Sequence, residues 1–376
     1  MRPVYSVITT MAAVSLLAVA PHSTGTVVSA AAPLPRATLI AAPAITLPGA
    51  VDSNSPVMWD LEGGQRRMFV LTSHSGIPSV SSGSEIDRMS GTAQVSIEPY
   101  PGYGVWFEAV VSDDVDTWYG FYHNEWPATR CGREDRAVPR IGAAKSRDHG
   151  RTWEDIGVVI QARRGTSACA STNRYVIGGV GDLSVMLDHD KHYLYFFYSQ
   201  YPEAAESQGV AVARLQWADR DRPWGKIEIW RNGVWDPDEG RRQLMEALPG
   251  MMRRLEWTYS AATPLIAPSL PWHDADDKVD AFWGPSVHWN TAIEQYVMLL
   301  NRARDENYGQ EGIYVSYAPR LDDPSLWSTP QKILNGGRWY PQVVGMTAGI
   351  GTDKLAAGSP RFFMSGKSEW VINFSK

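Results

Sequence analysis

The chain has 376 residues, with 41 acidic and 35 basic side chains and a formal net charge of −6. It contains no basic run or patch, so nucleic acid and anionic membrane surfaces are poor candidate partners. Aromatic and turn-forming residues are abundant, with 16 Trp, 16 Tyr and 33 Gly. This composition suits an all-β protein with many turns and an aromatic-lined cleft.

The first thirty residues have the features of a secretory signal peptide. Arg2 makes the start positive, Ile8–Ala20 is an apolar stretch too short to span a bilayer, and Val28-Ser29-Ala30 offers a small-residue cleavage site. Residues 1–30 are therefore expected to be a signal peptide. The mature chain is expected to be secreted or periplasmic, with no contact with the membrane beyond that peptide.

A repeated pair of strands follows. Residues 31–49, rich in Pro and Ala, are interpreted as a linker or as a strand that closes a ring, and residues 50–376 as the domain itself. Helical periodicity is confined to the neighbourhood of Gly240–Trp257. The repeat predicts an all-β, five-bladed β-propeller, or six blades if Ala211–Trp235 forms a blade of its own. The expected pairs are Asp52–Trp59 with Arg67–Ser73, Tyr103–Val111 with Trp118–Glu125, Gly178–Leu187 with His192–Gln200, Asp280–His288 with Gln295–Asn301, and Trp339–Val344 with Arg361–Ser365.

The segment Lys145–Trp153 contains S-x-D-x-G-x-T-W and resembles the Asp box of sialidases and related β-propellers. In such a hairpin Asp148 bonds the backbone ahead of it, Gly150 supplies the positive φ, and Trp153 packs under the turn. The motif lies at the outer edge of a blade, so it indicates architecture and not chemistry. The other interpretation is an ordinary Asx-turn hairpin in a different all-β protein.

Candidate catalytic groups fall in equivalent loops of the repeat. In a propeller, the loop that enters each inner strand and the loop that leaves the second strand meet on one face, around the axis. Glycoside hydrolysis needs two carboxyl groups that flank the scissile bond. Four carboxylates project onto the expected face: Asp52, Glu108, Glu125 and Asp182.

The same loops supply candidate substrate-binding residues. Indole faces stack on sugar rings, although large aromatics between blades are as often core residues. The candidates are Asn54, Trp106, His123, Trp283, His288, Trp339, Tyr340 and Gln342.

The layout resembles the five-bladed propeller glycosidases of the arabinanase and β-xylosidase-like clan, which is glycoside hydrolase family 43 and its relatives. That resemblance implies an Asp base at the start of blade one, an Asp on blade three that tunes the acid, and a Glu as the acid. Asp52 and Asp182 match the first two roles by position. Blade four, at Trp283–His288, has no carboxylate where the clan carries its acid, so the acid would be Glu108 or Glu125.

The expected function is that of an exported glycoside hydrolase acting on an oligo- or polysaccharide in an axial cleft. A non-catalytic carbohydrate-binding propeller is the first alternative, because the blade-four acid is missing. A sialidase-like hydrolase is the second, and it requires three arginines around the substrate carboxylate. The available arginines lie outside the loops that enter the inner strands: Arg130, Arg140, Arg302 and Arg361.

No cofactor is required by this chemistry. A structural Ca²⁺ is conceivable, and His288 is a candidate either for a central cation or for substrate, but no known calcium-loop spacing is present. The two cysteines, Cys131 and Cys169, are too few for a metal cluster. In an exported protein they form a disulfide or remain as two buried thiols.

Overall fold

The computed structural model describes residues 33–237, 257–273 and 278–376. The expected signal peptide at residues 1–30 and nearly all of the helical pattern at Gly240–Trp257 lie outside the described residues. Residues Leu34–Lys376 make up one folded unit. Within the described part of the chain, no helix has the length and hydropathy needed to cross a bilayer.

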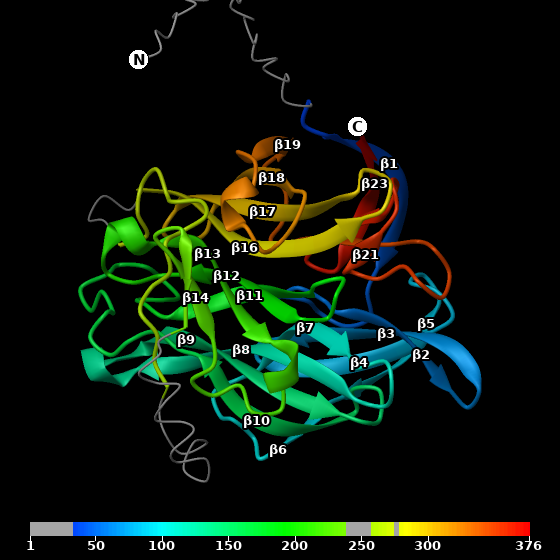
Figure 1. Ribbon diagram of the computed structural model, residues 1–376, viewed down its shortest axis with the longest axis horizontal. Coiled ribbons are helices and arrows are strands. Elements are labelled where there is room, and N and C mark those ends of the chain that lie inside the picture. The colour runs from blue at the N-terminus through cyan, green and yellow to red at the C-terminus, as the bar shows by residue number, and fades with distance from the viewer. Residues whose placement is uncertain (1–32, 238–256, 274–277) are drawn as a thin grey trace, which may run out of the picture. The chain divides into compact units, whose positions relative to one another are not determined.

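Five sheets, two of four strands and three of five strands, form five blades (Figure 1). Blade one contains β2 (Val57–Glu62), β3 (Gln65–His74), β4 (Ile77–Gly83) and β5 (Met89–Gln94). Blade two contains β7 (Trp106–Ser112), β8 (Trp118–Ala128), β9 (Arg133–Ser146), β10 (Thr152–Ile160) and the parallel strand β6 (Ser96–Glu98).

Blade three contains β11 (Val180–Leu187), β12 (Tyr193–Gln200), β13 (Gly209–Gln216), β14 (Glu228–Arg231) and β15 (Val234–Asp236). Blade four contains β16 (Lys278–Asn290), β17 (Gln295–Asp305), β18 (Gln310–Ala318), β19 (Gln331–Asn335) and the parallel strand β21 (Leu355–Ala356). Blade five contains β20 (Pro341–Val344), β22 (Arg361–Met364), β23 (Lys367–Ser375) and β1 (Arg36–Thr46).

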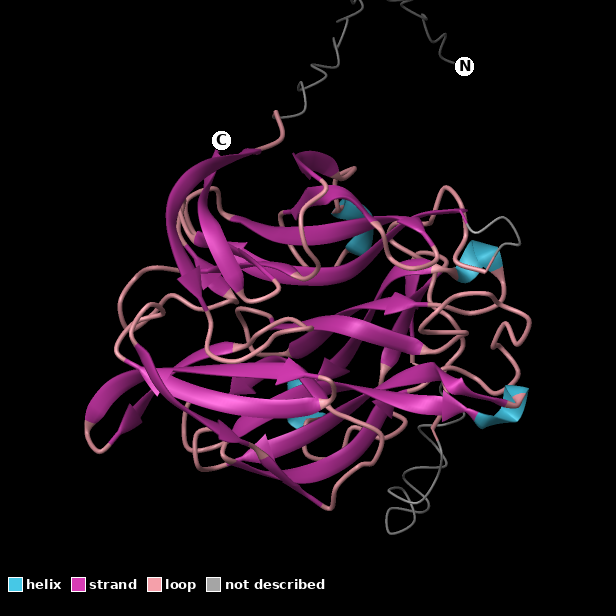
Figure 2. Cartoon of the chain, turned by 180° about the vertical axis from the view of Figure 1, so that it is seen from behind, coloured by secondary structure: helices cyan, strands magenta, loops and turns pink. Residues whose placement is uncertain are grey.

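The five-bladed prediction is confirmed, and each of the five expected strand pairs is the inner hairpin or strand pair of one blade. The six-blade alternative is wrong. β13 pairs with β12 and with β14, so residues 211–235 supply the outer strands of blade three and not a separate sheet. Helices are few and short in the described residues, as Figure 2 shows: η1 (Thr129–Cys131), η2 (Ala205–Ser207), η3 (Trp217–Asp219) and η5 (Pro324–Leu326).

The two ends of the folded unit meet in blade five. β1 pairs antiparallel with β23, and the register runs from Arg36 opposite Ser375 to Thr46 opposite Lys367 (Figure 1). The N-terminal strand thus forms the outer edge of a blade whose other strands come from the C-terminal end. This pairing joins the first and last parts of the domain by main-chain hydrogen bonds and so closes the ring.

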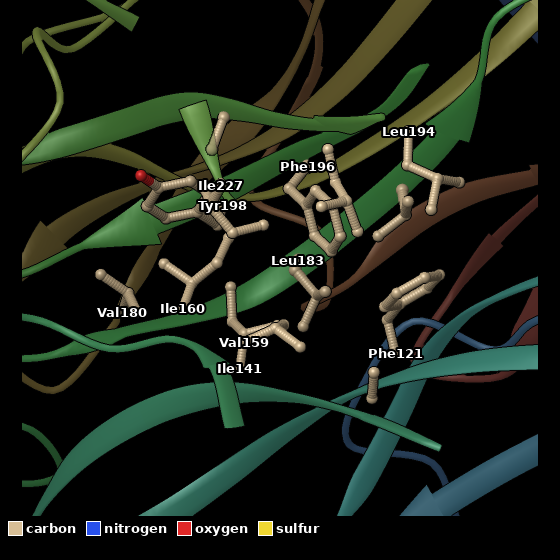
Figure 3. Packing of buried hydrophobic residues seen from close by; sticks show 14 of the residues in the cluster. Phe121, Ile141, Val159, Ile160, Val180, Leu183, Leu194, Phe196, Tyr198 and Ile227 are labelled. Carbon is tan, nitrogen blue, oxygen red and sulfur yellow. The ribbon is translucent and has the colours of Figure 1, made fainter. Parts of the chain in front are cut away.

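Apolar strands fill the spaces between blades. β12 is buried at seven of its eight positions, because neighbouring blades cover both of its faces. Figure 3 shows the cluster in which blades two and three meet, with Phe121 of β8 and Phe196 of β12 on facing strands. Their ring centroids lie 5.0 Å apart at 85°, an edge-to-face arrangement that favours this packing.

The turn between β9 and β10 is built by its own side chains. Asp148 accepts hydrogen bonds from the backbone N–H groups of Arg151 and Thr152 at 3.1 and 2.9 Å. Gly150 has φ +79°, and the indole of Trp153 is buried and donates to the Gly150 carbonyl at 2.8 Å. At the other end of β9, a disulfide joins Cys131, which lies just before the strand, to Cys169.

Truncation of Phe196 is expected to test the packing between blades two and three. Phe196 is 0 % exposed, so Phe196→Ala leaves a cavity and should lower the free energy of unfolding by about 3–5 kcal/mol in urea denaturation. Val115→Ala is the control. Val115 is 86 % exposed, and its truncation should change that free energy by less than about 0.5 kcal/mol.

Candidate active site

One cavity of about 210 Å³ collects side chains from all five blades. It contains the four predicted carboxylates and five of the eight predicted substrate-binding residues. Its lining consists of Asp52, Trp106, Glu108, His123, Glu125, Tyr175, Val176, Asp182, Trp283, Tyr308, Trp339 and Tyr340.

Asp52 lies in the loop before β2 and is oriented by groups of blades one and two. Its Oδ1 accepts the indole N–H of Trp106 at 2.7 Å, and its Oδ2 accepts the backbone N–H of Ser75 at 2.9 Å. The Nδ1 atom of His74 lies 3.4 Å from the same Oδ2. The Asp52 side chain is 33 % exposed, so the carboxylate is held in one orientation and is still reached by solvent.

Two of the carboxylates sit at irregularities in inner strands. The β7–β8 register shifts between Phe107 and Ala109, around Glu108, and the β11–β12 register shifts between Gly181 and Leu183, around Asp182. Asp182 also has φ +45°, an uncommon conformation for a non-glycine residue. A bulge interrupts the alternation of side chains. Each strand can therefore direct into the cavity a carboxylate that a regular strand would direct toward a neighbouring blade.

Glu108 and His123 form the floor of the cavity. Glu108 is 1 % exposed, and its Oε2 accepts the backbone N–H of Leu183 at 3.1 Å, while its Oε1 lies 3.4 Å from Nδ1 of His123. Burial raises the pKa of Glu108 to about 7, and the charge of Asp182 acts in the same direction. Burial alone would lower the pKa of His123, but Glu108, Asp182 and Glu125 together raise it to about 9.

Two tyrosines hold the carboxylate of Asp182. Tyr201 donates to Oδ2 at 2.8 Å and Tyr340 donates to Oδ1 at 3.2 Å. The backbone N–H of Asp182 donates to Nδ1 of His123 at 3.1 Å. Asp182 is therefore fixed by neutral donors on blades three and five and by the imidazole of blade two.

Glu125 is the most accessible of the four carboxylates, with its side chain 38 % exposed. It is the last cavity residue on β8, and its Oε1 lies 3.8 Å from Nε2 of His123. Burial raises the pKa of Glu125, the charge of His123 opposes this, and the charges of Asp182 and Asp52 add to it. A carboxyl with a raised pKa at the mouth of a cavity is suited to donate a proton to a bound molecule.

Aromatic rings form the opposite wall. Trp283 contacts Trp339 and Tyr340 with centroid distances of 5.6 and 5.5 Å, both near-perpendicular. Tyr308 packs on Trp283 at 4.8 Å, and Tyr175 packs on Tyr308 at 5.6 Å. These contacts make the wall a rigid surface of ring faces and edges.

Sequence reasoning missed three lining residues: Tyr175, Val176 and Tyr308. Tyr308 lies in the turn after β17, the position of a leaving loop, so the repeat could have indicated it. Tyr175 and Val176 lie in the long connection between blades two and three. The carbonyl-like Oδ1 of Asn173 accepts both of their backbone N–H groups, and no repeat position marks this loop.

Three predicted binding residues are not among the residues that line the cavity. Asn54 is buried and donates to the carbonyls of Leu183 and Pro285, at 3.0 and 3.1 Å. The side-chain amide of Gln342 bonds both the N–H and the carbonyl of Ser55, at 2.6 and 2.9 Å. Asn54 therefore links blade one to blades three and four, and Gln342 links blade five to blade one, so both make structural contacts in place of the predicted contact with substrate.

His288 lies inside blade four, 0 % exposed. Burial lowers its pKa to about 3, and the charge of Lys354 acts in the same direction, so the imidazole is neutral. The ammonium of Lys354 donates to Ser184 at 2.8 Å. A positive charge already acts on this ring, which disfavours the central cation considered for His288.

Glu108, His123 and Asp182 each offer an atom that could bind a metal ion, and these atoms lie within 4.8 Å of one another. When His123 is neutral, its Nδ1 atom can accept the N–H of Asp182; when it is protonated, the same nitrogen faces Oε1 of Glu108 at 3.4 Å. A metal ion would have to displace the proton that these carboxylates stabilise on His123, so the group fits the sharing of protons better than it fits a cation.

Three of the four arginines considered for a sialidase have other partners, and Arg130 is exposed in η1, outside the cavity lining. Arg302 pairs with Asp280, Arg361 bonds Ser368, and Arg140 stacks on a tryptophan ring. Among the described residues that line the cavity there is no arginine. The three-arginine grip on a substrate carboxylate is therefore not found in this part of the chain.

Comparisons with known proteins yield structures but no family. No family model matches the chain, and no curated protein matches it. The chain is similar to an arabinanase from Bacillus subtilis, with 13 % identity, a TM-score of 0.45 and coverage of 88 % of this chain and 95 % of that one. It is also similar to an endo-arabinase from Bacteroides thetaiotaomicron, with 8 % identity, a TM-score of 0.45 and coverage of 88 % and 97 %.

An exo-β-1,3-galactanase from Phanerochaete chrysosporium is similar at 10 % identity, with a TM-score of 0.45 and coverage of 88 % of this chain and 64 % of that one. These proteins are of the kind that the sequence layout resembles. At such low identity and TM-score they carry no argument about chemistry.

The raised pKa of Glu108 predicts a pH-dependent stability. An ordinary glutamate ionises near 4.5, so between that value and about pH 7 the folded state retains a proton that the unfolded chain has lost. The stability contribution is complete below about pH 4.5 and is lost as pH rises through 7. The free energy of unfolding should fall between pH 5 and 8 by up to about 3 kcal/mol.

Urea denaturation of Glu108→Gln measures this contribution, because the amide does not ionise. In the variant, most of the decrease in the free energy of unfolding between pH 5 and 8 should disappear. The substitution also removes the charged partner of His123. Glu369→Gln, at an exposed position of β23, should keep the wild-type pH dependence. If the free energy of unfolding changes with pH in the same way for wild type and for Glu108→Gln, then Glu108 is not the source of the decrease.

Proposed function

We propose that this protein is an exported glycoside hydrolase that cleaves a glycan bound in the axial cavity. The observation that carries the proposal is the convergence of Asp52, Glu125 and Asp182 on one cavity that also has a wall of aromatic rings. Two carboxyl groups and ring faces for sugar stacking are what glycoside hydrolysis requires. The disulfide supports an oxidising compartment, in agreement with the expected signal peptide.

Glu125 is the better candidate for the general acid than Glu108. Glu108 lies on the cavity floor at 1 % exposure and bonds the backbone of Leu183, so a glycosidic oxygen cannot easily reach it. Glu125 is more than one-third exposed and has a raised pKa. It would give its proton to the departing glycosidic oxygen.

Asp52 is proposed as the base. It would take a proton from the water molecule that attacks the anomeric carbon, while the glycosidic bond breaks. Its hydrogen bonds from Trp106 and Ser75 fix the direction of the carboxylate without neutralising it. Asp182 acts on the acid, because its charge contributes to the raised pKa of Glu125.

Hydrolysis of a panel of aryl glycosides and polysaccharides, by wild type and by Asp52→Asn, tests the proposal. Loss of a general base should lower kcat by about 10²–10⁴-fold while leaving the fold intact. Asp114→Asn, at an exposed hairpin tip, is the matched control and should keep wild-type rates. If no substrate is turned over although glycans bind, the protein is a carbohydrate-binding propeller and the hydrolase proposal is wrong.

If Glu125 is the general acid, the rate of hydrolysis should depend on pH and on how readily the leaving group departs without a proton. Because the acid must be protonated, kcat/KM should fall as pH rises through the raised pKa of Glu125. Glu125→Gln should lose this alkaline decline and should lose activity on alkyl glycosides. It should keep activity on dinitrophenyl glycosides, whose leaving group needs no proton. An equal loss on both substrate types would rule out Glu125 as the acid.

A further inference from the structure

Exposed aromatic rings also lie outside the cavity, on the loop that leads into blade two. Residues 99–105 connect β6 to β7. Tyr100 and Tyr103 of this loop are 57 % and 55 % exposed, and neither is among the residues that line the cavity. Two large rings exposed on one short loop beside a cavity are typical of a binding surface.

The loop meets the cavity lining at Trp106. The indole N–H of Trp106 donates to Oδ1 of Asp52 inside the cavity. The six-membered ring of the same indole packs against Gly104 of the loop and Gly76 of the β3–β4 turn, because a Cβ atom at either glycine would lie within 3.2 Å of it. The loop is therefore part of the rim, next to the carboxylate proposed as the base.

A second connection to the cavity runs through β8. Asn124 and Trp126 are the neighbours of Glu125 on this strand, and strand geometry directs them away from the face that carries Glu125. The Asn124 side chain is buried and its amide donates to the backbone carbonyls of both residues that flank Tyr103. The ring of Trp126 lies 4.6 Å from that of Tyr103 at 61°. Strand β8 thus holds both the proposed acid and the loop that carries Tyr103.

The backbone of Tyr103 has a conformation that a tyrosine rarely adopts. Its φ is +55°, between Gly102 at +82° and Gly104 at +75°. Residues in such conformations persist where surrounding contacts fix them, and they cluster at functional sites. Here the Asn124 amide fixes the loop, and the Tyr100 hydroxyl accepts the N–H of Gly104 at 3.1 Å. A ring that is more than half exposed gains little from packing, so its fixed position indicates binding.

The cavity leaves most of a longer glycan outside. A volume of about 210 Å³ is below the range of drug-sized pockets and suits one sugar unit. The other units of a chain must then lie over the rim, where Tyr103 continues the aromatic surface that starts at Trp106. Trp126 itself is covered by Arg140, whose guanidinium carbon lies 3.6 Å from the ring centroid. Tyr103 is therefore the ring that is free to meet a ligand.

We propose that Tyr103 binds a sugar unit outside the cavity, with its ring stacked on the apolar face of that sugar. The substrate class is then a chain, with one unit in the axial cavity and a further unit on Tyr103. Trp126 and Asn124 are positioning residues that hold the ring and its backbone. The proposal rests on the proposed function only in taking the ligand to be a glycan.

Binding measured against chain length tests the proposal. Calorimetric titration of the intact mature chain uses linear dimers and hexamers prepared from cellulose, xylan, arabinan and galactan. In at least one series the hexamer should bind about tenfold or more tightly than the dimer, because the longer chain gains the stacking contact. Equal affinity for the two lengths in every series, or no binding in any series, would overturn the proposal.

Substitution of Tyr103 locates the contact. Tyr103→Asn removes the ring, and asparagine tolerates the positive φ. The variant should bind the hexamer about tenfold more weakly and should lose most of the preference for the longer chain. Tyr103→Phe keeps the ring and should keep the preference. Val234→Ala, at the exposed outer edge of blade three, is the control and should match wild type.

Urea denaturation of the same variants separates binding from packing. If the Tyr103 ring served only to pack on Trp126, Tyr103→Asn would lower the free energy of unfolding and leave the preference for the hexamer unchanged, which contradicts the proposal. Tyr103→Gly is the second variant in case the first folds poorly, since glycine adopts a positive φ without strain. It should lose the same preference.

The two proposals fail in different ways. Hydrolysis of glycans with no dependence on chain length or on Tyr103 overturns the rim site and leaves the hydrolase standing. Binding that depends on chain length and on Tyr103, without hydrolysis of any glycan, supports the rim site and overturns the hydrolase.

Discussion

The cavity depends on two interruptions of regular strand pairing, at Glu108 in β7 and at Asp182 in β11. An inner strand of a propeller normally alternates its side chains between the two neighbouring blades, and neither direction is the axis. A bulge turns one residue out of that alternation. Because two adjacent blades do this, both carboxylates meet His123, and Asp182 adopts an unfavourable positive φ.

Such a charge cluster persists only because the surrounding framework is rigid. β1 closes the ring against β23, and the side chains of Asn54 and Gln342 join blades near the axis through backbone hydrogen bonds. The two bonds between Gln342 and Ser55 connect blade five to the loop just after Asp52. The positions of the carboxylates are therefore set by contacts among all the blades, and the repulsion between them is met by fixed dipoles and not by movement.

The site combines two kinds of acidic group in different environments. Burial makes the floor carboxyl Glu108 retain its proton to about pH 7, whereas Glu125 remains accessible at the rim. His123 lies between them, with one ring nitrogen toward each. Burial and the mutual repulsion of the carboxylates thus keep a proton available in the cavity.

The sequence by itself determined the repeat of paired apolar strands, the five blades and the loops that carry the carboxylates, because strand patterns and turn residues are local signals. It could not separate residues with the same loop position. Trp106 and Asn54 both lie in loops that enter an inner strand, but Trp106 lines the cavity and Asn54 is a buried link between blades. Tyr175 comes from a connection without any repeat signal. Only the tertiary structure decided these cases, because side-chain direction, burial and the bulges at Glu108 and Asp182 arise from contacts between segments far apart in the chain.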